Sequence, residues 1–504
     1  MGRRMTACGR SWARDSVRGM SDPVATSEDL LQALVRLEPE ARKLDATPAE
    51  LTGWLAELAS FSGEYLASNA SGPAFHGEGA GPPAPLELPR EPAPIGEVLS
   101  EYAELVLTRG LSAGSGRFFG YVPGGSVPSA ALGDYVAALT NPFVGVTPAA
   151  PGGAEIENAA VRWLIELLGF PHSAWGTLQS GGSLATLTAV VAARETRPAA
   201  EWARGVIYLT SEAHIAIRKA LHIAGLGEVA VREIAVDERL RMSVADLERR
   251  VRADREAGLL PWMVFASAGT VNTGEIDPLA AIADAAATHG LWFHVDAAYG
   301  GFLALVERTR PLLSGIERAD SVVLDPHKGL FLPWGSGAVL VRDGEALRRG
   351  FAVRSSYLDH VHRAGVPSPA DYSPELTRHF RALRMWMSLR LHGIERFRAA
   401  LEEKLVLAQL AHRRLAAMPA IETGPPPALS CVTFRARGEG DQATQALLAR
   451  VLARGRVHMS STKLRGRLVA RLCILSFRSH RAELEEALEE IARAGGEPVT
   501  TRRE

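Results

Sequence analysis

The central part of the chain alternates short apolar runs with longer segments whose apolar residues recur at helical spacing. The short runs predict buried strands, and the longer segments predict amphipathic helices. The predicted strands are 205–210, 229–236, 262–268, 291–297 and 320–325, and the predicted helices are 155–168, 183–194, 213–225, 243–256 and 278–289. Strands that alternate with helices in this way indicate an α/β fold built on a mostly parallel sheet.

The pattern changes on both sides of this region. Residues 27–69 have helical spacing, and the Pro/Gly-rich stretch 71–94 predicts an extended strap without regular structure. A long helix is predicted over 380–418. A smaller α+β segment follows it, with predicted strands 428–436 and 469–477 and predicted helices 441–454 and 481–494.

These patterns divide the chain into four parts. We expect a disordered leader over 1–26, an N-terminal helical arm and strap over 27–110, a large α/β domain over 111–385, and a linking helix with a small α+β domain over 386–504. The leader is rich in arginine but lacks the apolar stretch of a secretory signal. A disordered tail or a start codon upstream of Met20 accounts for it best, and a transit peptide is the alternative.

Composition narrows the class of protein. The chain of 504 residues has a formal net charge of −1, which argues against a partner that is a nucleic acid or an anionic membrane. No apolar run reaches the length of about 18 residues that a transmembrane helix needs. The three cysteines, Cys8, Cys431 and Cys473, are far apart and form neither a disulfide framework nor a metal cluster, so we expect a cytoplasmic protein without a metal.

A Gly/Ser turn at 180–183 opens the predicted helix 183–194. Free backbone N–H groups and the helix dipole favour an anion at such a position, and the hydroxyls of Ser180 and Ser183 can add hydrogen bonds. The turn matches neither the dinucleotide fingerprint nor the Walker pattern. It is a candidate phosphate site, although Gly/Ser helix caps without a ligand are common.

Two charged residues stand near strand ends. Asp296 ends an apolar strand, and Lys328 follows the strand 320–325 closely. Ligands of open α/β sheets bind at the carboxyl ends of the strands, so these residues can meet in one site. Taken singly, each has an ordinary structural explanation: a helix cap or ion pair for Asp296, and a solvated surface charge for Lys328.

The combination of these features favours one cofactor. Pyridoxal phosphate requires phosphate donors, a lysine for its aldehyde and a carboxylate for its ring nitrogen, and an imidazole such as that of His214 can stack on its ring. Several motifs, in this order, resemble the group II pyridoxal-phosphate-dependent decarboxylases, which include the aromatic-L-amino-acid, glutamate and histidine decarboxylases. The motifs are RFFGYVPGG (117–125), SEAH (211–214), HVDAAYGG (294–301), DPHK (325–328) and FRALRMW (380–386).

The resemblance extends from about Phe118 to residue 492 and implies a fold of type I among pyridoxal-phosphate enzymes, a homodimer and an amino acid as the small-molecule substrate. It implies that Lys328 forms a Schiff base with the cofactor, that Asp296 pairs with the ring nitrogen, and that His214 stacks on the ring. The further cofactor-binding residues that it implies are Ser180, Gly182, Ser183, Thr270, Ala298, Asp325 and His327. The residues that it implies for the substrate are Tyr121, Val122, Pro123 and Arg378.

The sequence departs from the family pattern at some positions. Asp325 stands where an asparagine is common, and Gly329 stands where a tryptophan is usual. The family has a mobile loop with a tyrosine that protonates the product. The corresponding stretch 353–375 offers Tyr372 as the first candidate and Tyr357 as the second.

The resemblance predicts decarboxylation of an L-amino acid, and we favour an aromatic one because the candidate pocket residues are aromatic or apolar. A glutamate-like substrate is the alternative. Oxidative decarboxylation and deamination to an aldehyde is a second alternative, if the loop acid is not a tyrosine. An aminotransferase or a membrane-bound lyase of the same fold agrees less well with the motifs. A non-catalytic protein of this fold would be a different class, against which Lys328, Asp296 and His214 argue.

Overall fold

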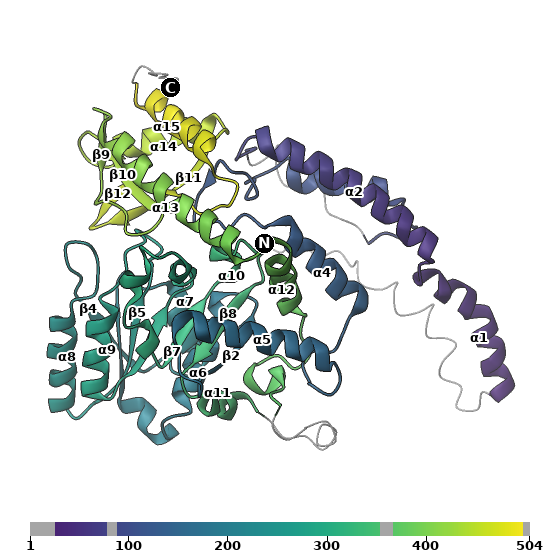
Figure 1. Cartoon of the computed structure of the whole chain (residues 1–504), viewed down its shortest axis with the longest axis horizontal. Coiled ribbons are helices and arrows are strands. Elements are labelled where there is room, and N and C mark those ends of the chain that lie inside the picture. Colours follow the sequence, from purple (N-terminus) through teal and green to yellow (C-terminus); the bar gives the residue numbers. More distant parts are fainter. Residues whose placement is uncertain (1–25, 78–87, 353–365, 497–504) are drawn as a thin grey trace, which may run out of the picture. The chain divides into compact units, whose positions relative to one another are not determined.

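The computed structural model describes residues 26–77, 88–352 and 366–496 of the chain (Figure 1). Its contacts group the chain into two compact units, one of residues 1–67 and 85–103 and the other of residues 68–84 and 104–504. The larger unit contains both sheets. The domain boundaries expected after residues 110 and 385 therefore stay predictions, and the expected leader lies outside the described residues up to residue 25.

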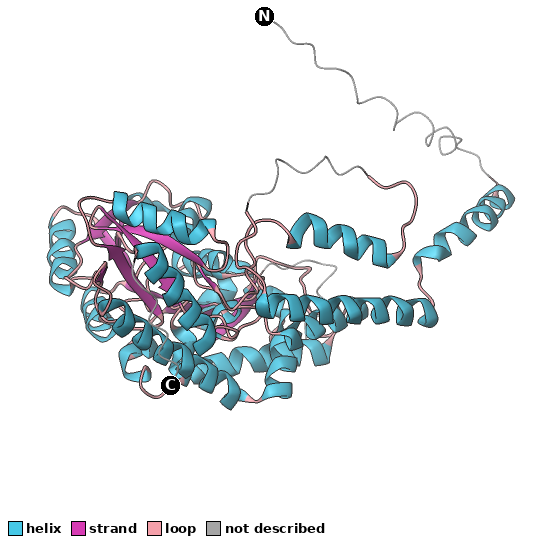
Figure 2. Cartoon of the chain, turned by 90° about the horizontal axis from the view of Figure 1, so that it is seen from above, coloured by secondary structure: helices cyan, strands magenta, loops and turns pink. Residues whose placement is uncertain are grey.

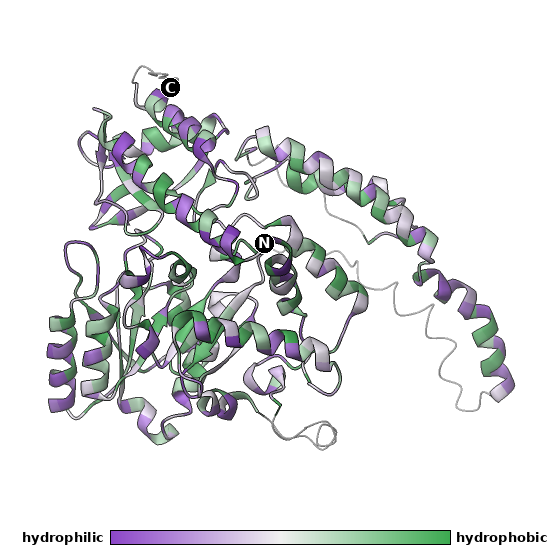
Figure 3. Cartoon of the chain, in the orientation of Figure 1, coloured by the Kyte–Doolittle hydropathy of each residue, from purple (hydrophilic) through white to green (hydrophobic). Residues whose placement is uncertain are grey.

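The smaller unit is helical, as the apolar spacing predicts. Its helices are α1 (Ser27–Ala41), most of α2 (Pro48–Ser71) and α3 (Ile95–Tyr102). Thr26 caps α1, because its hydroxyl accepts the backbone N–H of Asp29 while the Asp29 carboxylate accepts that of Thr26. The apolar positions of these helices leave large side chains exposed, with Leu34 58% and Trp54 46% accessible (Figure 3).

The main sheet of the larger unit has seven strands in the order β2-β8-β7-β6-β5-β3-β4. The strands are β2 (Trp175–Gln179), β3 (Gly205–Thr210), β4 (Ala230–Ile234), β5 (Leu260–Ser267), β6 (Trp292–Asp296), β7 (Ser321–Leu324) and β8 (Gly337–Val341). β8 alone runs opposite in direction to the other six described strands of this sheet, so the expected mostly parallel sheet is confirmed. β3 and β7 are buried along their whole length, as strands covered on both faces must be.

Helices cover both faces of this sheet (Figure 2). Those of the large α/β part are α4 (Pro128–Thr140), α5 (Pro151–Leu168), α6 (Gly182–Arg194), α7 (Ile215–Ile223), α8 (Val244–Glu256), α9 (Leu279–His289), α10 (Pro326–Gly329), α11 (Gly344–Phe351) and α12 (Arg381–His392). The predicted helices from 155 to 289 correspond to α5–α9. The edge strand β2 was not predicted, because its sequence WGTLQ lacks the β-branched apolar run of the central strands.

The second sheet has five strands in the order β1-β11-β12-β10-β9. Its strands are β1 (Phe118–Phe119), β9 (Ile421–Thr423), β10 (Cys431–Ala436), β11 (His458–Leu464) and β12 (Arg467–Cys473), and its helices are α14 (Gln442–Ala453) and α15 (Arg481–Gly495). The long helix predicted over 380–418 is wrong in one respect. Gly393, at φ 68°, ends α12, and a separate helix α13 (Ile394–Ala416) follows it.

No helix among the described residues is both long enough and apolar enough to cross a membrane.

Candidate active site

A cavity of about 330 Å³ lies at the carboxyl ends of the central strands. Ser267 of β5, Asp296 of β6 and the segment after β7 line it. Because β2 and β7 are both antiparallel to β8, they run in the same direction, and the turn after β2 reaches the same edge of the sheet. Every residue that the sequence analysis assigned to the cofactor lines this cavity, namely Ser180, Gly182, Ser183, His214, Thr270, Asp296, Ala298, Asp325, His327 and Lys328.

Lys328 lies in α10, the single short helix turn that directly follows β7. Its Nζ is 2.8 Å from Oδ2 of Asp325, and the side chain of Lys328 is 20% exposed. Asp325 is almost fully buried, and its Oδ1 has no hydrogen-bond partner among the described residues. A buried carboxylate is costly unless it is paired, so Asp325 holds the lysine amine at the cavity by ionic attraction.

Asp296 occupies the last position of β6, opposite Ser267 of β5 and Val323 of β7. Its Oδ1 accepts the backbone N–H of Ala298 over 3.1 Å, which orients the carboxylate at the strand end. His294, two residues earlier, is fully buried, and burial lowers the pKa of its imidazole to about 4 although the charge of Asp296 acts in the opposite direction. His294 is therefore neutral near pH 7 and supplies no positive charge to Asp296.

The turn between β2 and α6 brings the backbone of Gly182 close to the carboxylate of Asp325. A Cβ atom on Gly182 would lie 3.0 Å from Oδ2 of Asp325, so only glycine leaves the space at the first residue of the helix open. The first turn of α6 has free N–H groups, and Ser183 and Thr186 also line the cavity. Amide and hydroxyl donors at a helix N-terminus, with a lysine and a strand-end carboxylate across the cavity, fit pyridoxal phosphate.

Two histidines border the site in different ways. His214 is the N-cap of α7, where its Nδ1 accepts the backbone N–H of Ala216 over 3.2 Å, so the proton of the neutral ring is on Nε2. The Nδ1 of His327 donates to the carbonyl oxygen of Ser336 over 2.6 Å, and its Nε2 lies 3.5 Å from Asp325. Burial lowers the pKa of His327, against the opposing effect of Asp325.

The three apolar or aromatic substrate candidates, Tyr121, Val122 and Pro123, are not part of the cavity lining. The residue that follows them, Gly124, lies next to the cavity. A Cβ atom on Gly124 would be 2.0 Å from the carbonyl oxygen of His327, so the backbones of Gly124 and His327 are in direct contact. Tyr121 has a left-handed backbone at φ 54° and is 62% exposed. Arg471 donates to its carbonyl oxygen over 3.4 Å and stabilises this conformation.

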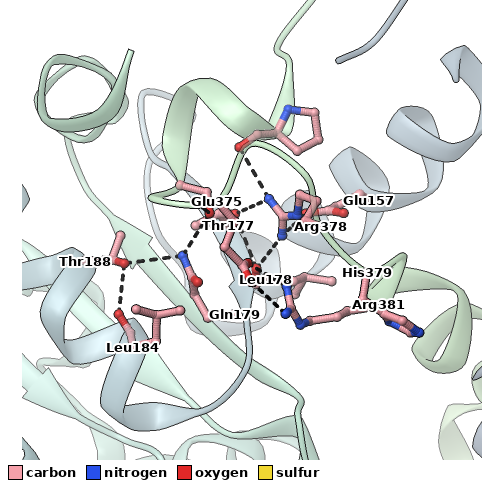
Figure 4. A network of polar contacts seen from close by, with 12 residues as sticks. Glu157, Thr177, Leu178, Gln179, Leu184, Thr188, Glu375, Arg378, His379 and Arg381 are labelled. Atoms are coloured by element: carbon pink, nitrogen blue, oxygen red, sulfur yellow. Dashed lines mark hydrogen bonds and ion pairs between the residues drawn. The ribbon is translucent and has the colours of Figure 1, made fainter. Parts of the chain in front are cut away.

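Arg378, the fourth substrate candidate, also lies outside the cavity lining. Its side chain is completely buried and forms an ion pair of 2.7 Å with Glu157 of α5 (Figure 4). It also donates to Thr177 Oγ1 over 3.0 Å and to the carbonyl oxygen of Leu178, both on β2. Through these contacts Arg378 supports the strand whose end leads into the turn at 180–183.

Of the two candidates for the loop acid, only Tyr372 lies among the described residues. Tyr372 is buried and packs against Trp175, with ring centroids 5.9 Å apart, and it does not line the cavity. Burial raises the pKa of its hydroxyl. Tyr357 lies outside the described residues. Both assignments stay predictions.

Other lining residues were not singled out from the sequence. They include Glu212, Ser267, Val271 and Tyr299. The carboxylate of Glu212 accepts a hydrogen bond of 3.0 Å from the side chain of Asn272. The signal that could have found them is position, because each follows or ends a strand whose carboxyl end is at the cavity, as Asp296 does.

The known proteins that this chain resembles in sequence and in structure include amino-acid decarboxylases. The family model of the pyridoxal-dependent decarboxylase conserved domain matches residues 80–437, which is more than half of the chain. An aromatic-L-amino-acid decarboxylase of Bacillus atrophaeus is 33% identical over 74% of this chain and 80% of its own length. An L-2,4-diaminobutyrate decarboxylase of Rhizobium meliloti is 35% identical over 70% of this chain and 72% of its own length. The crystal structure of Oryza sativa TDC with PLP and tryptamine matches with a TM-score of 0.83 and 25% identity, over 90% of this chain and 99% of that one.

Proposed function

Because the chain belongs to the pyridoxal-dependent decarboxylase family, and is therefore a pyridoxal-phosphate-dependent amino-acid decarboxylase, we propose that its substrate is an aromatic L-amino acid. The product would be the corresponding amine and carbon dioxide. The observation that supports catalysis by this chain is the meeting of Lys328, Asp296 and the start of α6 at one cavity. A non-catalytic protein would have no need to keep all three.

Each residue has a role in this proposal. Lys328 would hold the cofactor covalently, and Asp296 would accept a hydrogen bond from the ring nitrogen and keep it protonated. Gly182 and Ser183 would bind the phosphate with their backbone N–H groups, with help from the hydroxyl of Ser183. When bound, pyridoxal phosphate supplies an electron sink that stabilises the charge left on the substrate when carbon dioxide departs.

The remaining lining residues would shape the site around the ring. His214 would cover one face of the cofactor with its imidazole, and the small side chain of Ala298 would leave room on the other. Ser180, Thr270 and His327 would stay close to the phosphate end. Asp325 would keep the amine of Lys328 at the cavity until the cofactor arrives, since the two are 2.8 Å apart.

The charges of the cavity support the choice of an aromatic substrate over a glutamate-like one. Among the described lining residues, Lys328 is the only lysine or arginine, and it is committed to the cofactor. An acidic side chain would enter without a counter-ion, which is costly in a partly buried site. An aromatic side chain has no such requirement.

A basic side chain is the second candidate, because Glu212 lines the cavity. Its carboxylate has one described hydrogen bond, to Asn272, and could accept a substrate ammonium group as well. The diaminobutyrate decarboxylase among the relatives agrees with this alternative.

We also propose that the protein is a cytoplasmic homodimer. The exposed apolar side chains of α1 and α2, which include Leu30, Leu34 and Trp54, support dimerisation, since such stripes are normally covered by a partner. The buried free thiols of Cys431 and Cys473 agree with a reducing compartment. Light scattering combined with gel filtration would measure the mass of the particle, and a monomer at micromolar concentration would contradict the homodimer.

The test of function is product analysis by mass spectrometry. Purified protein loaded with pyridoxal phosphate is incubated with a pool of L-amino acids that includes phenylalanine, tyrosine, tryptophan, glutamate and 2,4-diaminobutyrate. We expect the amine of an aromatic substrate, lighter than the amino acid by one carbon dioxide. An aldehyde with ammonia would move the protein to the oxidative alternative, and the diamine would favour the role of Glu212.

Two lysine variants provide the control. Lys328→Ala is expected to abolish turnover and the cofactor adduct that borohydride traps, whereas Lys219→Ala, an exposed lysine of α7, is expected to change neither. Trapping of the cofactor on another residue in Lys328→Ala would contradict the assignment. The absence of any product from the pool would contradict the proposed substrate class.

A further inference from the structure

Two of the three cysteines are neighbours in the second sheet. Cys431 begins β10 and Cys473 ends β12, and they are directly opposite each other in the antiparallel pairing of these strands. The adjacent pair, Ser430 and Ile474, carries the backbone hydrogen bond, of 2.8 Å. Cys431 and Cys473 are therefore a non-hydrogen-bonded pair, in which Cα atoms are about 4.5 Å apart and side chains are closest. That separation is within the range of disulfides.

The cysteine pair lies directly behind the wall of the active-site cavity. The sulfur of Cys473 is 3.9 Å from the hydroxyl of Tyr299, and Tyr299 lines the cavity. The sulfur of Cys431 is 3.7 Å from the carbonyl oxygen of Asn272, next to the lining residue Val271. A covalent change at the two sulfurs would thus act on two separate parts of the cavity wall.

The surroundings of Cys431 favour its thiolate form. A hydrogen bond from Cys473 and the guanidinium of Arg471 hold the pKa of Cys431 below its ordinary value, against the effect of burial. Hydrogen bonding to Cys431 and burial raise the pKa of Cys473. One sulfur is thereby prepared as the nucleophile, and the other keeps its proton.

A second cavity, of about 210 Å³, gives small molecules access to the pair. Cys431 lines it together with residues of β9, β10 and β12. The cavity also has residues from the loops at 238–240 and 273–275, outside the second sheet. Cys431 is only 2% exposed, so a small uncharged oxidant can reach it more readily than a bulky reagent can.

We propose that Cys431 and Cys473 are a redox modification site at which oxidation by hydrogen peroxide forms a reversible disulfide. The sulfur of Cys431 attacks one peroxide oxygen, and the O–O bond breaks, so that Cys431 becomes a sulfenic acid and the first water leaves. The sulfur of Cys473 then attacks the sulfenic sulfur, the S–O bond breaks, and the S–S bond forms with release of a second water. The two thiols lose two electrons and two protons, and hydrogen peroxide is reduced to two molecules of water.

The disulfide changes the wall of the active-site cavity. It draws the sulfur of Cys473, now 3.9 Å from the hydroxyl of Tyr299, to bonding distance of the Cys431 sulfur, and it removes the negative charge that Arg471 faces at Cys431. Arg471 also donates to the carbonyl oxygens of Val271 and Asn272, so its position influences the loop that carries Thr270. We expect oxidation to lower kcat/KM by roughly 10- to 100-fold, which is the loss that displacements on the ångström scale produce in an active site.

The experiment uses the full chain with Cys8→Ser as background, so that only the two buried thiols remain. The protein loaded with pyridoxal phosphate is treated with hydrogen peroxide and digested without reductant. We expect a cross-linked peptide that joins Cys431 to Cys473 and is lighter by two hydrogen atoms than the two separate peptides. Dithiothreitol should restore both peptides and the turnover.

Cys431→Ser and Cys473→Ser are the matched variants. In Cys431→Ser, turnover should be insensitive to the peroxide dose that inhibits the background protein, whereas Cys473→Ser should keep a sulfenic acid on Cys431 that a dimedone label detects and should form no cross-link. Sulfinic or sulfonic acid on Cys431 without a cross-link, or reduced thiols at doses that oxidise other residues, would overturn the proposal. A cross-link that leaves turnover and the affinity for pyridoxal phosphate unchanged would overturn its connection to the active site. The effect on turnover rests on the proposed function, whereas the cross-linked peptide is detected without any catalysis.

Discussion

The guanidinium of Arg378 and the carboxylate of Glu157 form an ion pair of 2.7 Å in which both side chains are inaccessible to solvent (Figure 4). The pair joins α5 to the segment before α12, and Arg378 also contacts β2. Burial raises the pKa of Glu157, and Arg378 acts in the opposite direction. The contacts of Arg378 with Thr177 and Leu178 hold β2 in place. At the end of the same strand, the side-chain amide of Gln179 donates a hydrogen bond of 3.3 Å to Thr188 of α6.

We expect Arg378→Met to destabilise the protein by about 3–5 kcal/mol, since it leaves the carboxylate of Glu157 buried without the arginine of its ion pair. The double variant Arg378→Met/Glu157→Gln should recover most of this loss. Urea unfolding measures both. Arg318→Met removes an ion pair of the same length that is exposed, and it should change stability by less than about 1 kcal/mol.

The same variants test whether Arg378 binds the substrate carboxylate, as the family resemblance implies. If it does, KM should rise in Arg378→Met, and Glu157→Gln should not restore it. If Arg378 acts by supporting β2, the double variant should regain KM together with stability.

Gly182→Ala tests the phosphate site. A Cβ atom at this position would lie 3.0 Å from Asp325 Oδ2, in the space that the turn leaves open. We expect the Kd for pyridoxal phosphate to rise by roughly tenfold, about 1.4 kcal/mol, in fluorescence titrations of the apoenzyme. Gly152→Ala is the matched control, because Gly152 is also in the first turn of a helix and a Cβ there has no neighbour within 4 Å. Equal Kd values for the two variants would place the phosphate elsewhere.

The two loop-acid candidates should differ in the product that their variants release. Because the ring of Tyr372 packs on Trp175 away from the cavity lining, Tyr372→Phe should still release the amine. Tyr357→Phe should shift the product toward the aldehyde, with oxygen consumption, if this residue donates the proton to the substrate α-carbon. Mass spectrometry identifies the product of each variant, and an oxygen electrode measures its oxygen consumption. If only Tyr372→Phe changes the product, Tyr372 is the loop acid and Tyr357 is not.

His294 should make the protein sensitive to acid. The pKa of its imidazole is about 4 in the folded protein and 6.5 in its ordinary state. Between these values the unfolded chain binds more protons than the folded one, so the free energy of unfolding falls as the pH is lowered through this window. The loss reaches roughly 3 kcal/mol at the lower end.

The variant His294→Asn isolates this contribution, because its amide can replace the contact of Nδ1 with Ser321 Oγ at 2.8 Å. Urea unfolding at several pH values should show a shallower dependence between pH 6.5 and 4 than in the unchanged protein. His172→Asn, an exposed histidine, is the control for loss of an imidazole. Parallel pH profiles for His294→Asn and the unchanged protein would contradict the prediction.

Local patterns of the sequence were sufficient for much of the fold and for bringing Asp296 and Lys328 to one cavity, whereas the other candidate cofactor residues came from the family resemblance. The apolar runs around Asp296 and Lys328 predicted strands, and the rule that strand ends meet at one edge of a sheet predicted that these residues would lie together. Such patterns depend on neighbours within a few residues, which is why they can be seen without the fold. The break at Gly393 was missed because the apolar spacing continues on both sides of it.

Contacts between distant segments were decided only by the tertiary structure. The spacing of residues along the sequence does not predict that Glu157 contacts Arg378 or that Cys431 contacts Cys473. Such contacts depend on how the strands and helices pack against one another. From the sequence alone, Arg378 was a substrate residue and the cysteines were unrelated. Packing made the arginine half of a buried ion pair, because a buried charge requires a partner, and strand pairing made the two thiols neighbours.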